Sequence, residues 1–160
     1  MRLRPIFLIV FALCVTFSAN TSAQTSQTAT FQVDPINEIS VSGNPGALAI
    51  NTAVAGSAPT AASNASTTWA VTTNQTGAKV TAAINLAMPA GVTLSLNLQN
   101  PAGATSTTVS LRTLAVDAVT GITKLNESGR TVTYTLAATA IAGVVASTSH
   151  TVTLTMVAGA

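Results

Sequence analysis

Threonine alternates with apolar residues in two runs near the end of the chain. Residues 131–138 read TVTYTLAA, residues 149–156 read SHTVTLTM, and the turn-forming cluster Glu127-Ser128-Gly129 precedes the first run. A period of two places successive side chains on opposite faces of an extended chain, so each run predicts a β-strand with one buried face. The residues predicted to anchor the core from these two strands are Tyr134, Val152, Leu154 and Met156.

Comparable runs lie upstream, separated by clusters of Gly, Pro, Asn and Ser. Residues 92–98 show the alternation most clearly. Residues 67–73 and 79–86 flank the turn sequence Asn74-Gln75-Thr76-Gly77, which predicts a hairpin. Trp69 takes an inward-facing position in the first strand of this hairpin and is therefore predicted to be another core anchor.

Shorter signals complete the predicted fold. Brief strands are expected at residues 36–41, 48–50 and 107–111, whereas residues 52–65 are rich in Ala, Ser, Gly and Pro and predict a loop. Residues 114–119 fit either a strand or one helical turn. No sustained helical period occurs, so the sequence predicts an all-β fold: an Ig-like, Greek-key antiparallel β-sandwich of about seven to nine short strands, with sequence neighbours paired as hairpins.

The first 23 residues have the pattern of a secretory signal peptide. Arg2 and Arg4 precede the apolar residues 6–17, and Thr21-Ser22-Ala23 supplies small residues for cleavage. The apolar run is shorter than the roughly 20 residues of a membrane-spanning helix, so no span is expected after its removal. The single cysteine, Cys14, would be removed with it. The predicted protein is secreted, to the cell surface, the extracellular space or the periplasm.

This cleavage defines the predicted organisation of the exported chain. Residues 24–33 form a polar, uncharged tail, and residues 34–160 form one sandwich domain. Loss of Arg2 and Arg4 from the six basic residues leaves four, which the four acidic residues balance. A neutral chain lacks the clustered Lys and Arg that nucleic acids or anionic membranes require, so neither is an expected partner.

Few residues have side chains suited to catalysis. His150 is the only histidine, and no Gly-x-Ser-x-Gly motif accompanies the neighbouring serines. One histidine without a cysteine in the exported chain is a poor zinc site, so no metal or other cofactor is expected. The carboxylates are interpreted as solvated turn residues; they are Asp34, Glu38, Asp117 and Glu127. The sequence therefore predicts a protein that is not an enzyme.

The N-terminal residues of the exported chain also alternate. Ala29, Phe31 and Val33 are separated by polar residues and are followed by the break Asp34-Pro35. Together with residues 151–156, which read TVTLTM, they give the chain an outline that resembles the Ig-like subunits of bacterial fimbriae and surface fibres. The resemblance implies that this segment is an assembly strand lent to a neighbour's sheet. The implied partners are further copies or other surface proteins.

Two functions follow from these features. The first is a secreted, non-catalytic structural subunit of a pilus, fibre or matrix at the cell surface. The alternative is an adhesin-like or carbohydrate-binding sandwich that acts through residues 52–65 or through a flat sheet face. A carbohydrate platform requires solvent-facing Trp or Tyr, whereas Trp69 and Tyr134 both have inward parity, which favours the structural subunit.

Overall fold

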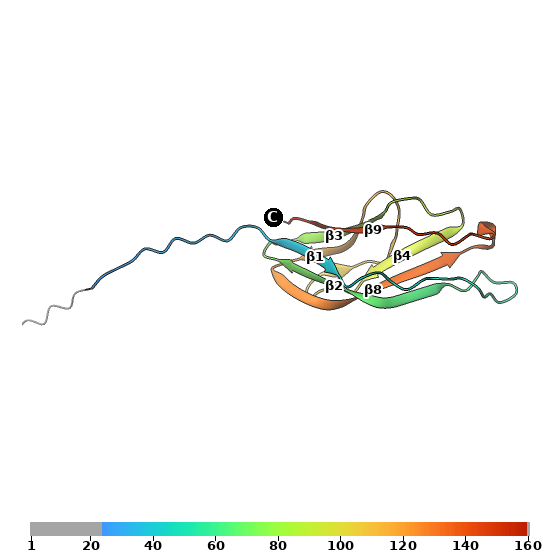
Figure 1. The fold of residues 1–160 in the computed structure, drawn as a ribbon, viewed down its shortest axis with the longest axis horizontal. Helices are drawn as coiled ribbons and strands as arrows, with labels where there is room; N and C mark the ends of the chain where they lie inside the picture. Colours follow the sequence, from blue (N-terminus) through green and yellow to red (C-terminus); the bar gives the residue numbers. More distant parts are fainter. Residues whose placement is uncertain (1–23, 160) are drawn as a thin grey trace, which may run out of the picture. The chain divides into compact units, whose positions relative to one another are not determined.

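Two antiparallel β-sheets pack face to face in the computed structural model, which describes residues 24–159 (Figure 1). One sheet has the strand order β1-β2-β8-β4-β6, and the other has the order β5-β7-β3-β9. The elements are β1 (Asn37–Val41), β2 (Ala62–Thr73), β3 (Ala78–Ile84), β4 (Val92–Leu98), β5 (Thr105–Ser106), β6 (Val109–Ser110), β7 (Val116–Ile122), β8 (Leu125–Ala138), the 3-10 turn η1 (Ala140–Ala142) and β9 (Val152–Val157).

These nine strands within residues 24–159 confirm the prediction of an all-β sandwich. Residues Val33–Ala160 make one compact unit, and residues 24–32 do not belong to it. The predicted signal peptide, residues 1–23, lies outside the described part of the chain.

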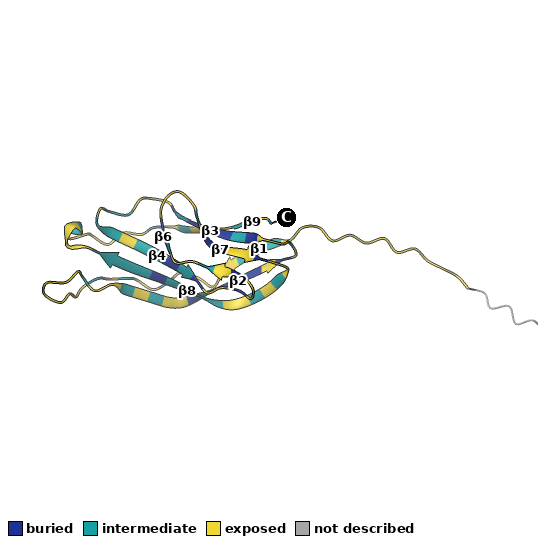
Figure 2. Ribbon diagram, turned by 180° about the vertical axis from the view of Figure 1, so that it is seen from behind, coloured by how far each residue is buried: buried dark blue, intermediate teal, exposed yellow. Residues whose placement is uncertain are grey.

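The core lies between the sheets, and buried residues alternate with less buried ones along parts of β2, β3, β4 and β8 (Figure 2). In β3 the alternation is complete, since every second residue from Ala78 to Ile84 is buried. The opposing sheet contributes Trp69, Leu96 and Leu98, all almost fully buried. The chain needs no disulfide to hold this arrangement, because burial of apolar surface and the ladder hydrogen bonds supply the stabilising free energy.

The five core anchors named from the sequence occupy two environments. Trp69 and Tyr134 are buried, with exposed fractions of 1% and 8%. Val152, Leu154 and Met156 all lie on the inward side of β9, but they are only partly buried and pack against the margin of the core. This difference follows from the position of β9 at the edge of its sheet, where one flank has no hydrogen-bonded strand.

Two of the predicted hairpins are wrong, whereas the predicted strands at 92–98 and 107–111, which are neighbours in the sequence, do pair antiparallel as β4 and β6. β2 and β3 are joined by residues 74–77 but lie in different sheets, and β8 and β9 are likewise separated. The alternation is compatible with either arrangement, because it requires only that the apolar faces be buried. Here the buried faces of β2 and β3 meet across the core, so the Asn74–Gly77 turn carries the chain from one sheet to the other.

Several local predictions also need correction. Residues 48–50 form no strand, the loop expected at 52–65 ends where β2 begins at Ala62, and residues 107–111 contribute only the two-residue strand β6. The cluster Glu127-Ser128-Gly129 is a bulge inside β8: the register shifts between Trp69 and Val71 on β2, and Gly129 supplies a φ of 69°. Of the two structures predicted for residues 114–119, the strand is the one that forms, since β7 begins at Val116.

Burial raises the pKa of Tyr134 above the ordinary tyrosine value of about 10. Because Tyr134 is the only tyrosine, absorbance at 295 nm should follow this one phenol and give a midpoint above 10 in the folded protein. The folded state binds the proton more tightly than the unfolded state, so the stability contribution is complete below pH 10 and declines as pH rises above it. A midpoint at 10 or lower, in a protein still folded by circular dichroism, would contradict this.

Candidate assembly surface

The N-terminal segment, residues 24–36, is exposed along its whole length and contains no assigned strand. Phe31 and Val33 have exposed fractions of 91% and 73%, which is unusual for large apolar side chains in a folded protein. The strand predicted from Ala29, Phe31 and Val33 is therefore absent from this structure. Strand geometry is maintained by hydrogen bonds to a neighbouring backbone, and the segment joins neither sheet.

Two side chains anchor the chain where it enters the sandwich. The Asn74 side chain accepts a hydrogen bond from the Ile36 backbone amide and donates one to the Asp34 carbonyl oxygen, both at 2.8 Å. Gln75 Oε1 accepts hydrogen bonds from Asn37 Nδ2 at 2.7 Å and from the Gly159 amide at 3.1 Å. The start of β1 and the last described residues are thus held at the same end of the sandwich, beside the 74–77 turn.

β9 is an edge strand without charge. It pairs with β3 alone, and its sequence, VTLTMV, offers no charged or proline residue. Edge strands present a row of free N–H and C=O groups, and natural proteins commonly protect them with charge, proline or a bulge. β9 has none of these, because its register with β3 is continuous from Val152 to Val157.

A groove runs between the two sheets on the side where β1 and β9 lie. Its larger part has a cavity volume of about 960 Å³, and a smaller part of about 560 Å³ continues from it. The two parts share Pro45, Leu48, Leu94 and His150. Inward residues of β4 and β8, including Leu94 and Leu136, form the apolar floor.

Two stretches of unpaired backbone flank this groove. We call them the 43–51 flank, which follows β1, and the 144–150 flank, which precedes β9; both contribute lining residues. Within residues 24–159, neither flank makes a backbone-to-backbone hydrogen bond. Figure 1 shows both running along the sandwich as irregular chain rather than as arrows. The prediction of a strand at residues 48–50 falls in the first flank, which has no assigned strand and no backbone hydrogen-bond partner within residues 24–159.

Exposed apolar side chains gather around one end of the groove. Val54 lies in the 51–60 connection, and Ile141, Val144 and Val145 lie in or just after η1, with exposed fractions between 42% and 103%. Figure 1 places this connection and η1 at the same end of the sandwich. Exposed apolar clusters commonly mark contact surfaces, so this end of the groove is a candidate for a protein contact.

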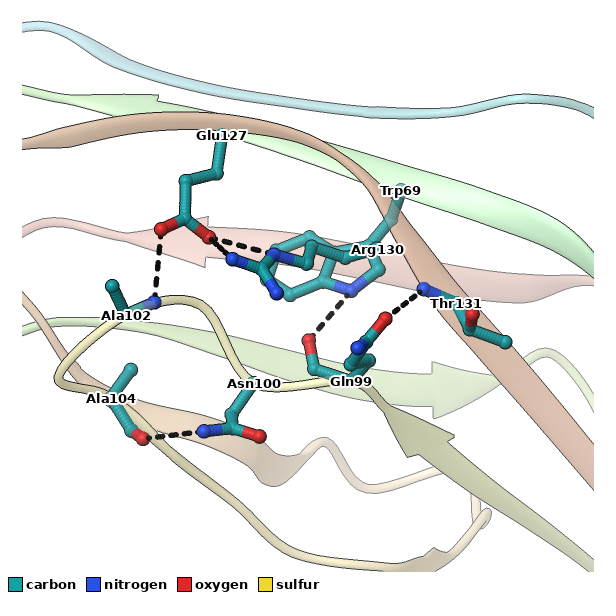
Figure 3. A network of polar contacts seen from close by, with 8 residues as sticks. All are labelled: Trp69, Gln99, Asn100, Ala102, Ala104, Glu127, Arg130 and Thr131. Atoms are coloured by element: carbon teal, nitrogen blue, oxygen red, sulfur yellow. Dashed lines mark hydrogen bonds and ion pairs between the residues drawn. The ribbon is translucent and has the colours of Figure 1, made fainter.

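A polar network connects the loop after β4 to β2 and β8 (Figure 3). Arg130 Nη2 and Nε lie 2.6 and 2.8 Å from Glu127 Oε2, while Glu127 Oε1 accepts a hydrogen bond from the Ala102 amide at 3.1 Å. Trp69 Nε1 donates to the Gln99 carbonyl oxygen at 3.2 Å. The network fixes the loop after β4 against β8, and it engages Glu127, which the sequence suggested was a solvated turn residue.

His150 and Asp117 each have one nearby partner in the described part of the chain. His150 Nδ1 lies 3.2 Å from the Leu86 carbonyl oxygen at the rim of the groove. Asp117 is paired with Lys79 at 3.0 Å on the exposed surface. In the stretch from residue 24 to residue 159, no three His, Cys, Asp or Glu residues come together as metal ligands. The same stretch contains no helix long and apolar enough to cross a membrane.

Comparison with protein-family models, curated proteins and solved structures found no match to this chain. Sequence reasoning identified the exposed segment but missed the groove. Its floor residues carried a strand signal that predicted burial, and its flanks carried only the short apolar triplet at 48–50. Nothing in the linear sequence indicates that two distant flanks face each other.

Proposed function

We propose that this protein is an exported, non-catalytic structural subunit of an extracellular or cell-surface assembly, in which subunits associate by β-strand pairing. The observation that carries the proposal is the uncharged edge strand β9 beside an apolar groove, in a chain that also exposes Phe31 and Val33. A strand added to a sheet edge gains main-chain hydrogen bonds, and its alternate side chains fill pockets.

The burial of the two large polar aromatics argues against the carbohydrate-binding alternative. Trp69 and Tyr134 are both buried, and the Trp69 indole N–H is already bonded to the Gln99 carbonyl oxygen. Sugar platforms require an aromatic face open to solvent. Phe31 is the exposed aromatic side chain in the described part of the chain, and it lies in the N-terminal segment rather than on a sheet.

The proposal predicts that the N-terminal segment is required for self-association. The chain beginning at Gln24 should form oligomers as its concentration rises, whereas a chain beginning at Asp34 should remain monomeric. Light scattering and electron microscopy of both chains measure this. The shorter chain retains the compact unit and its whole core, so it is expected to fold.

Two substitutions in the chain that begins at Gln24 separate the effect of a side chain from the effect of shortening the segment. Phe31→Ser removes an exposed apolar group and should weaken self-association, whereas Thr30→Ser on the alternate face should leave it unchanged. If the chain from Gln24 is monomeric at every accessible concentration, the proposed function is wrong.

A further inference from the structure

The groove has the form of a sheet site from which one strand is missing. Its floor is apolar, and on each side it meets an extended flank whose backbone groups are free of main-chain partners within residues 24–159. Exposed backbone can be satisfied by water, but an inserted strand would satisfy both flanks at once and cover the floor. The flanks run in opposite directions, so such a strand would lie parallel to one and antiparallel to the other.

The length of the groove defines the length of its occupant. Its floor follows β8 from Val132 to Ala138, six steps of about 3.3 Å, which is about 20 Å. An extended segment of about seven residues spans that distance. Residues 27–33, which read QTATFQV, have this length and place Ala29, Phe31 and Val33 on one face.

The chemistry of the groove also matches that segment. Neither part of the groove is lined by Asp, Glu, Lys or Arg, and its titratable lining residues are His150 and Tyr134. The side chains of residues 24–33 carry no charge either. A segment that carried a charge would lose solvation on insertion without gaining a partner, which would exclude it.

The point where the N-terminal segment joins the sandwich favours a second copy of the chain as the source of the strand that fills the groove. Asn74 holds residues 34 and 36 at the 74–77 end of the sandwich, whereas the groove reaches the 51–60 connection and η1 at the other end. When the inserting segment leaves one end of the sandwich and the groove opens at the other, two copies meet through different surfaces, which is a heterologous contact. Such contacts produce open chains of subunits unless their rotation closes a ring.

We infer that residues 27–33 of one copy insert as an extended strand into the groove between the 43–51 and 144–150 flanks of a second copy. Phe31 and Val33 sit on the Leu94 and Leu136 side chains. The inference rests on the proposed function and adds the acceptor site, the occupant and the head-to-tail polarity of the assembly.

Site-directed disulfide formation tests the contact directly. The chain from Gln24 contains no cysteine, so two single-cysteine variants can be mixed without background. Thr30→Cys lies on the outward face of the segment, and Ala146→Cys lies on an exposed part of the groove lining. Mild oxidation should give a 30–146 heterodimer, identified by mass spectrometry. Thr30→Cys mixed with Ala115→Cys, an exposed position that lines neither part of the groove, should not.

A charge placed in the groove tests the energetics of the same contact. Ala146→Glu should weaken self-association at least about tenfold by light scattering, because insertion would desolvate an unpaired carboxylate. Ala115→Glu adds the same charge elsewhere on the surface and should have little effect. Both positions are exposed, so both variants should keep the unfolding midpoint of the parent chain.

The outcomes separate this inference from the proposed function. If the parent chain self-associates but Ala146→Glu has no effect and no 30–146 bridge forms, the groove is not the acceptor and the function stands. A 30–146 bridge within single molecules of the double variant, in place of bridges between molecules, would show that each chain fills its own groove. That result would overturn the inference of a second copy. Absence of self-association in the parent chain would overturn both proposals.

Discussion

Replacing Trp69 with alanine should lower the free energy of unfolding by about 4 kcal/mol, as expected for a large aromatic residue removed from a well-packed core. Trp69 is 1% exposed, and it heads the fully buried side chains by size. Its removal also leaves the Gln99 carbonyl oxygen without the indole donor at 3.2 Å. Because Trp69 is the only tryptophan, urea unfolding should be followed by far-ultraviolet circular dichroism.

Trp69→Phe provides the graded companion to this variant. It retains an aromatic ring but loses volume and the hydrogen bond. Its loss of unfolding free energy relative to the parent chain should therefore be smaller than that of Trp69→Ala, at about 1–3 kcal/mol. This variant keeps the prediction testable if the alanine variant does not fold. Equal midpoints for Trp69→Phe and the parent chain would show that neither the indole donor nor its extra volume contributes to stability.

Replacing Leu96 with alanine should cost about 3 kcal/mol of unfolding free energy. Leu96 lies in the middle of β4, has an exposed fraction of 0% and faces the core beside the Leu98 and Trp69 positions of the same sheet. The cost has two parts, the lost transfer of the side chain from water and the cavity that remains. Tryptophan fluorescence in urea measures it, since Trp69 is intact in this variant.

Leu86→Ala is the matched control, because it removes the same atoms from a side chain that is 61% exposed just after β3. Its effect should be within about 0.5 kcal/mol, as for most surface substitutions. A large loss for Leu86→Ala, with a small one for Leu96→Ala, would contradict the burial described for these two side chains.

The stability of this sandwich depends on packing rather than on charge or covalent cross-links. In the described part of the chain, the ion pairs are Lys79 with Asp117, which is largely exposed, and Arg130 with Glu127, which is partly covered. Exposed pairs contribute little net free energy, typically up to about 1 kcal/mol. The same scarcity of charge extends to β9 and to the groove lining, neither of which contains Asp, Glu, Lys or Arg.

Local pattern was sufficient to place the longer strands and the faces they bury, but it predicted a strand at 48–50 that does not form and missed the start of β2 at Ala62. Alternation depends only on the two-residue period of an extended chain, so the sequence alone placed residues 92–98 in a strand and assigned Trp69 and Tyr134 to the core side. The fold class and the uncharged, alternating character of residues 24–33 could also be predicted from the sequence. Each of these properties is a relation between residues that are close together in the chain.

Only the tertiary structure decided which strands pair. The Asn74–Gly77 turn is compatible with a hairpin or with a crossing between sheets, and burial of β2 against β3 across the core selected the crossing. Gly129 reads locally as a turn residue, but its positive φ serves a bulge because β8 continues past it to pair with β2. The groove depends on flanks about 100 residues apart, which no local signal relates. Strand periodicity is a local property, whereas strand order and the space left between edges come from the packing of the whole chain.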